Sequence, residues 1–109
     1  MVDGRRTVVA ALEGEGYRVL TATGLEALGV AHELQPDVVV LDATGPGHDR
    51  AVGELARRLR ELGPTELIPL VALGAQGRPR AALPVNEVVL PPCTMDEVAA
   101  IVACWLPAA

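Results

Sequence analysis

The chain has 109 residues, which is enough for one domain and too short for two. Half of the residues are apolar, so we expect a folded chain, and the absence of Phe leaves Val, Leu, Ile and Ala to form the core. The formal net charge of −5 argues against sequence-independent binding of nucleic acid, which depends on Lys and Arg. All nine basic residues are Arg, and the chain has no Lys.

The sequence predicts neither a membrane protein nor a secreted one. No apolar run reaches the roughly 18 residues that a membrane span needs, and the first residues lack the apolar core of a signal peptide. We therefore expect a cytoplasmic protein. Cys93 and Cys104 are eleven residues apart, with Cys104 in a predicted helix. Three helical turns span about 16 Å, which is too far for a disulfide, so both thiols are expected to be reduced.

Helical and strand patterns alternate from the beginning of the chain. Asp3 can cap a first helix that runs to about Glu13, where two glycines end it. Residues 17–21 read as a short strand. The spacing of Thr23 and Glu26 is that of a capping box, which predicts a second helix through Leu34.

The middle of the chain reads as strand, loop and helix. The uninterrupted apolar run at 38–41 is typical of a central strand that is covered on both faces. Gly and Pro make residues 42–48 a loop, after which Asp49 is the predicted N-cap of a third helix. On this helix we expect two ion pairs of i,i+4 spacing, Glu54–Arg58 and Arg57–Glu61. The arginines at 57, 58 and 60 read as a solvated basic surface.

The last third of the chain is expected to contain two strands and one helix. Residues 67–73 form an apolar strand pattern and residues 87–90 a shorter one. Between them, Pro79 and Pro84 limit residues 74–86 to a turn or two of helix. Thr94 and Glu97 have the spacing of a second capping box, which predicts a final helix with Trp105 on its apolar face. The whole of 1–109 is expected to form a single domain.

One segment, Pro36 to Asp49, resembles the response-regulator receiver domains of two-component signalling. It combines an apolar strand, an aspartate at its end, Asp42, and Pro46-Gly47 four and five residues later. The resemblance extends over nearly the whole chain and implies a flavodoxin-like, doubly wound parallel sheet of strand order 2-1-3-4-5. It also implies that Asp42 occupies the position of the phosphoacceptor.

The other parts of the receiver site do not match. In that family an acidic pair helps to hold Mg²⁺, and a hydroxyl and a Lys contact the phosphoryl group. Here the acidic pair has at most Asp3 to represent it, the hydroxyl position falls on Gly74, and the Lys position falls on Pro91. The carbonyl of Thr44 could add one metal ligand. Too few groups then remain to offset the charge of a transferring phosphoryl group, so Mg²⁺ is expected only if Asp42 is functional.

Three functions remain as hypotheses, and none of them makes the chain an enzyme. We favour a degenerate receiver that acts through protein contacts without phosphorylation, with Asp42 as a polar strand end. The second is a phosphoacceptor that uses Asp42, with missing parts supplied by upstream sequence or a partner. The third is a small-ligand sensor with a pocket around Asp42, Gly74 and Pro91. Expected partners are proteins, such as a histidine kinase or another regulator, and neither nucleic acid nor membrane.

The first strand of the receiver pattern is missing from this sequence, so we expect four strands in one chain. The strands at 17–21 and 38–41 would both lose a hydrogen-bonding neighbour, and each buried unpaired backbone group costs about 1–3 kcal/mol. The two strands could pair directly, or two chains could exchange elements. We favour a homodimer in which two chains exchange or abut elements, with domain swapping as one form of it, because exposed strand edges attract other strands.

Overall fold

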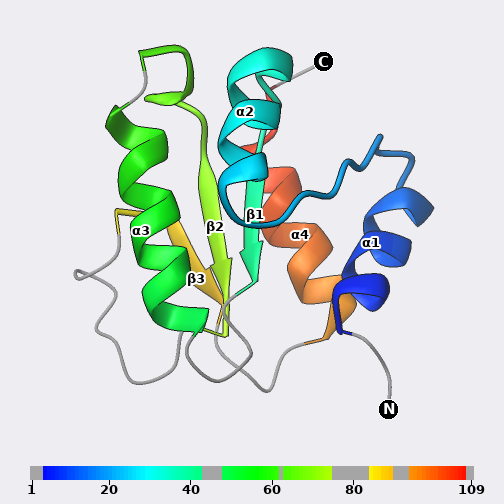
Figure 1. The fold of residues 1–109 in the computed structure, drawn as a ribbon. Coiled ribbons are helices and arrows are strands. Elements are labelled where there is room, and N and C mark those ends of the chain that lie inside the picture. Colours follow the sequence, from blue (N-terminus) through cyan, green and yellow to red (C-terminus); the bar gives the residue numbers. More distant parts are fainter. Residues whose placement is uncertain (1–3, 43–47, 62, 75–83, 90–93, 108–109) are drawn as a thin grey trace.

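The computed structural model describes residues 4–42, 48–61, 63–74, 84–89 and 94–107. Within these ranges the chain forms four α-helices, a 3-10 turn and three parallel strands (Figure 1). The elements in chain order are α1 (Gly4–Gly14), α2 (Gly24–Leu34), β1 (Val39–Asp42), α3 (His48–Glu61), the 3-10 turn η1 (Gly63–Thr65), β2 (Leu70–Leu73), β3 (Glu87–Val89) and α4 (Met95–Trp105).

The strands form one parallel sheet in the order β1-β2-β3. Leu41 lies opposite Ala72, and Ala72 lies opposite Val88. Parallel strands packed with helices are the architecture that the alternating pattern predicted, and the α/β class is confirmed. One expectation about the sheet is wrong: β1 has a neighbour only on its β2 side among the described residues, so it is an edge strand and not a central one.

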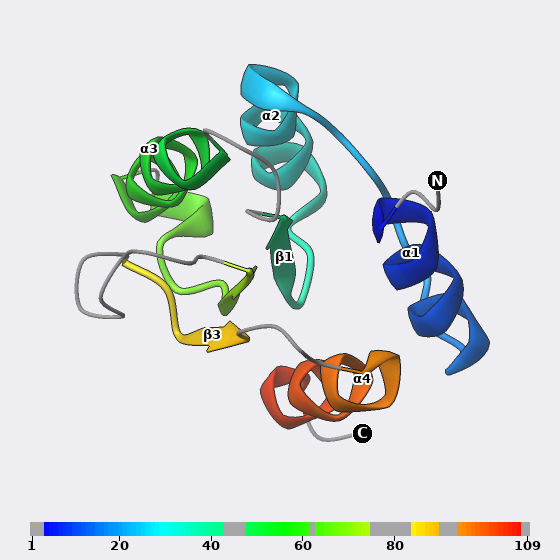
Figure 2. The same cartoon turned by 90° about the horizontal axis from the view of Figure 1, so that it is seen from below.

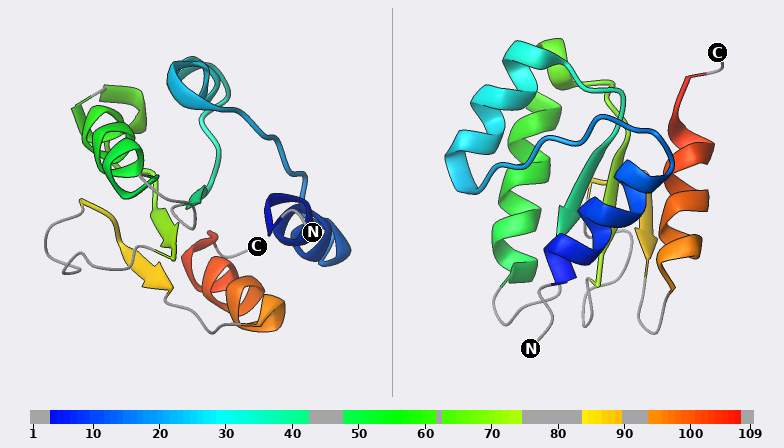
Figure 3. Two further views of the ribbon diagram at one scale, coloured as in Figure 1. Left: turned by 60° about the horizontal axis from the view of Figure 1, so that its bottom comes forward. Right: turned by 90° about the vertical axis from the view of Figure 1, so that its right-hand side faces the viewer.

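Helices cover both faces of this sheet (Figures 2 and 3). Because side chains alternate along a strand, β2 supplies both halves of the core. Leu70 and Ala72 join the cluster under α2 and α3, which includes the buried Leu59. Val71 and Leu73 join the cluster under α1 and α4. All four residues of β2 are buried, as expected for a strand covered on both sides.

The strand expected at residues 17–21 is absent, so the described sheet has three strands and not four. The segment keeps the alternation that suggested a strand, because Tyr17 and Val19 are half-buried while Arg18 and Leu20 are exposed. It pairs with no strand and simply connects α1 to α2. Alternation predicts which side chains face a core, but a strand also needs a neighbour, and the direct pairing with β1 does not form.

The two predicted capping boxes have different outcomes. At α4 the box is complete: Thr94 Oγ1 accepts a hydrogen bond of 3.1 Å from the Glu97 amide, and the Thr94 amide donates to Glu97 Oε2 at 3.3 Å. At α2 the Thr23 side chain makes no such bond. The first residue of that helix, Gly24, has a φ of 56°, which is not the backbone geometry of a regular helical first turn.

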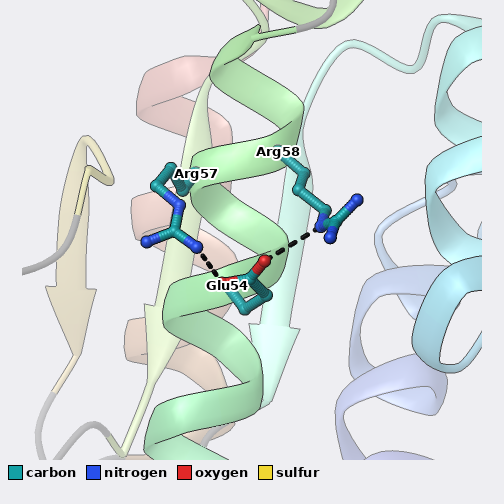
Figure 4. A network of polar contacts seen from close by, with 3 residues as sticks. All are labelled: Glu54, Arg57 and Arg58. Atoms are coloured by element: carbon teal, nitrogen blue, oxygen red, sulfur yellow. Dashed lines mark hydrogen bonds and ion pairs between the residues drawn. The ribbon is translucent and has the colours of Figure 1, made fainter.

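The polar surface of α3 also differs from the prediction in one pair. Glu54 and Arg58 form the expected ion pair, with 3.0 Å between Oε1 and Nε. Arg57, however, binds the same Glu54 at i,i+3 spacing and not Glu61, so one carboxylate serves two guanidinium groups (Figure 4). Hydrogen bonds from Arg58 and then Arg57 lower the pKa of Glu54. The helix begins at His48, so Asp49 lies inside its first turn and is not its N-cap.

Arg60 does not belong to the solvated surface where the sequence placed it. Its Nη1 donates to the carbonyls of Glu66 and Ile68 at 2.9 and 2.8 Å, and its Nε donates to the carbonyl of Pro84 at 3.1 Å. Its Nη2 donates to Asn86 Oδ1, which also accepts from the Leu70 amide at 2.9 Å. The guanidinium therefore joins the end of α3 to the segments that enter β2 and β3.

Candidate functional site

Two of the predicted site residues meet at the carboxyl edge of the sheet. Asp42 is the last residue of β1, is exposed, and lies opposite Leu73 of β2. Gly74 follows Leu73 directly and is buried, and its amide donates to the Val89 carbonyl at 2.8 Å. Parallel pairing thus brings the carboxyl ends of all three strands, and with them Asp42 and Gly74, to one end of the sheet.

The chemistry that this pair offers is one carboxylate beside a backbone position. Gly74 has a φ of 72°, in the left-handed region, and has no side chain to contact a ligand. The remaining predicted positions, Asp3, Thr44 and Pro91, lie outside the described residues. In the described part of this edge, the Asp42 carboxylate can therefore accept hydrogen bonds or bind a cation.

A divalent metal ion would need more ligands than this part of the edge supplies. Mg²⁺ prefers six oxygen ligands in octahedral arrangement. Across the described ranges of the chain, no three His, Cys, Asp or Glu side chains lie close enough together to hold a metal ion. Asp42 alone does not make a Mg²⁺ site, and its other candidate ligands, Asp3 and Thr44, are not among the described residues.

Two shallow grooves lie elsewhere on the described surface. The first, of about 380 Å³, lies at the amino ends of the strands, where Pro36 and Pro69 precede β1 and β2 and Trp105 ends α4. The second, of about 260 Å³, lies between the end of α1 and the side of α4 and includes Tyr17. Neither groove includes Asp42 or Gly74, so neither corresponds to the predicted ligand pocket.

Among the described helices, none has the length and apolar character that a membrane span requires.

Solved structures share this arrangement of strands and helices. A protein described as a response regulator from Chloroflexus aurantiacus superposes with a TM-score of 0.72 at 27% sequence identity, over 92% of this chain and 85% of that one. The chain has a receiver-domain fold. The parallel strands β1, β2 and β3 thus correspond to the last three strands of the order expected from the resemblance, and the predicted fold is confirmed.

Other receiver structures extend the comparison at lower identity. The chemotaxis protein CheY4 of Vibrio cholerae matches with a TM-score of 0.75 and 22% identity, over 97% of this chain and 92% of that one. The receiver domain of the sensor histidine kinase PA1611 of Pseudomonas aeruginosa matches with a TM-score of 0.69 and 21% identity, over 94% and 87%. That receiver holds a magnesium ion in its active-site cleft. No family model and no curated protein sequence matches this chain.

The fold therefore shows which kind of domain this chain forms, and it does not show a reaction. Receiver domains are generally signalling modules of two-component systems and not enzymes, and they interact with histidine kinases and other regulators. Sequence reasoning missed two features of this receiver fold: the Arg60 network and the groove beside Trp105. Both join residues that are far apart in the sequence, so no local pattern pointed to them.

Proposed function

We propose that this chain is a receiver-like signalling module that acts through protein contacts without phosphorylation. One observation carries the proposal: the residue at the carboxyl end of β2, where a receiver would place its hydroxyl, is the buried Gly74, whose amide is already bonded to Val89. A glycine has no side chain with which to contact a phosphoryl group. The chain also contains no Lys, and Pro91 stands at the Lys position of the resemblance.

The physical argument concerns charge. Phosphoryl transfer to a carboxylate gathers negative charge on oxygens, and catalysis depends on cations and donors that are placed to offset it. Around Asp42 the sequence supplies neither the hydroxyl nor the ammonium group for this purpose. Asp42 then serves as the polar end of a strand, and signalling depends on which surfaces the domain presents.

The alternative is a phosphoacceptor that uses Asp42, and the placement of this residue favours it. Asp42 is exposed at the carboxyl end of a parallel strand, the place where doubly wound folds carry their sites. In that case Mg²⁺ is the required cofactor, with Asp42 and the positions of Asp3 and Thr44 as its candidate ligands. Upstream sequence or a partner would supply the groups that are missing.

Phosphodonor treatment separates the two proposals. The protein is incubated with acetyl phosphate and Mg²⁺ and weighed intact, with Asp42→Asn as the matched variant and a phosphorylatable receiver as the positive control. We expect the wild type and the variant to have the same mass spectrum. A stoichiometric gain of one phosphoryl group in the wild type, absent from Asp42→Asn, would establish the phosphoacceptor instead.

The proposal includes the setting in which the module acts. We infer a single domain over residues 1–109 that works in the cytoplasm with a histidine kinase or another regulator as its partner. We also infer a homodimer, because β1 leaves one strand edge without a neighbour among the described residues. Light scattering at micromolar concentration tests the dimer, and a folded monomer would refute it.

A further inference from the structure

The edge of β1 that faces away from β2, here called the open edge, presents backbone groups to no other strand of the described sheet. The Val39 amide donates to the Pro69 carbonyl at 2.9 Å, which places Val39 and Leu41 toward β2 in the parallel register. Because alternate residues of a strand point their backbone groups in opposite directions, the amide and carbonyl of Val40 point to the open edge. They are available to another strand.

The two edges of the sheet differ in how well they are protected. β3 is only three residues long and begins with the charged Glu87, and both features discourage pairing with another strand. β1 is longer and begins with three apolar residues, Val39 to Leu41. Val39 and Val40 are only half-buried, whereas their partners in β2, Leu70 and Val71, have no exposed surface. An added strand on the open edge would therefore bury apolar surface as well as satisfy backbone groups.

The same chain carries a strand-like segment at residues 17–21 that pairs with no described strand, although Tyr17 and Val19 pack against the core. Its side chains alternate between half-buried and exposed, and Leu20 is 53% exposed. Glycines with positive φ stand on either side of it, Gly16 at 91° and Gly24 at 56°, and a Cβ at either would meet nothing within 4 Å. The segment connects α1 on one face of the sheet to α2 on the other, beside the open edge (Figure 2).

We propose that the open edge of β1 is the binding site for residues 17–21 of a second copy of this chain. The proposal rests on the homodimer inferred above and specifies its contact. In its own chain the segment is held at both ends, by α1 against α4 and by α2 against α3. If residues 4–23 exchange as one arm about Gly24, α1 keeps its contacts with α4, now between chains, and the segment is released to pair with β1. A second copy of this chain offers both parts, the exchanged arm and the open edge.

Two exposed leucines provide a matched pair of variants. Leu20 lies in the exchanged segment. Leu67, which is 89% exposed, lies outside that segment and lines the groove that includes Trp105. We expect Leu20→Asp to raise the dimer dissociation constant about a hundredfold, because each of the two symmetric contacts loses about tenfold when a carboxylate is placed in it. Leu67→Asp should leave the dimer unchanged. Analytical ultracentrifugation measures both.

A variant of the acceptor strand completes the test. Val40→Pro removes the amide that faces the open edge without removing a bond to β2, and we expect it to dissociate the dimer as Leu20→Asp does. Mixing the two monomeric variants should restore a heterodimer, because the segment of the Val40→Pro copy is intact and so is the edge of the Leu20→Asp copy. In the wild type, hydrogen exchange should find the Val40 amide protected in the dimer and exposed after dilution.

Other results would overturn the proposal. A dimer that dissociates with Leu67→Asp and not with Leu20→Asp would keep the homodimer and place its contact at the Trp105 groove. A monomer whose Val40 amide is protected would mean that residues 17–21 pair with β1 of their own chain. A monomer whose Val40 amide is exposed would mean that the open edge does not bind a second copy and is available to another protein. The phosphodonor experiment is read by mass, so its outcome is independent of all of these.

Discussion

Arg60 offers the sharpest test of how this small sheet is held together. Arg60→Met keeps much of the length and apolar volume of the side chain and removes four hydrogen bonds, which join α3 to the segments that enter β2 and β3. Burial lowers the pKa of Arg60, but a guanidinium remains charged at neutral pH, so the loss is that of a charged donor.

The size of the effect follows from which acceptors remain buried. The carbonyls of Pro84 and Glu66 belong to exposed residues and can bind water when the guanidinium is gone. The Ile68 carbonyl and Asn86 Oδ1 are in partly buried bonds, and a buried acceptor without a donor costs about 1–3 kcal/mol. Asn86 keeps its bond from the Leu70 amide, so we expect a total loss of about 3 kcal/mol.

Urea denaturation followed by far-UV circular dichroism measures this loss, with Arg58→Met as the matched control. Arg58 pairs with Glu54 on the solvated side of α3, where removal of an exposed ion pair changes the free energy of unfolding very little. At about 4 °C per kcal/mol, Arg60→Met should also lower Tm by roughly 12 °C. Equal effects of the two variants would refute the reasoning.

Three further predictions follow from single contacts. Thr94→Ala removes the capping box of α4 and should destabilise the domain by about 1 kcal/mol in urea, whereas Thr23→Ala, which loses no cap bond, should cost less. Leu59→Ala empties a core position that is 1% exposed and should cost about 3 kcal/mol; a cost under 1 kcal/mol would contradict the packing under α3. The pKa of Glu54, measured by NMR titration, should lie below that of a free glutamate and rise in Arg58→Gln. Because the folded-state pKa is lowered, the stabilising effect of this pair is present above the unfolded-state pKa and is lost as pH falls through the folded-state value.

The sequence predicted most elements of the fold because their signals are local. The apolar run before Asp42 and the Thr94–Glu97 box each specify one element without reference to the rest of the chain, and both are confirmed. Asp42 and Gly74 lie near each other because the ends of parallel strands share an edge, but their role as a site stays a prediction.

The errors arose where a distant or competing partner decides the outcome. Residues 17–21 have the alternation of a strand, but no described strand lies in position to bond with them. Arg57 had two acids within reach on its helix, and spacing alone did not indicate that it pairs with Glu54. Arg60 binds Asn86, 26 residues away, and only the folded sheet brings the two together. The roles of Asp3, Thr44 and Pro91 stay predictions, because these residues lie outside the described ranges.

The backbone at Gly74 bears on whether evolution could place a hydroxyl at this position. With a φ of 72°, this position suits glycine, and a residue with a Cβ there costs about 1–2 kcal/mol. Threonine, which is β-branched, is a conformational outlier in that region. A codon change that introduces threonine at this position would therefore destabilise the domain unless the strand end were reshaped as well. Selection on stability alone is enough to favour glycine here.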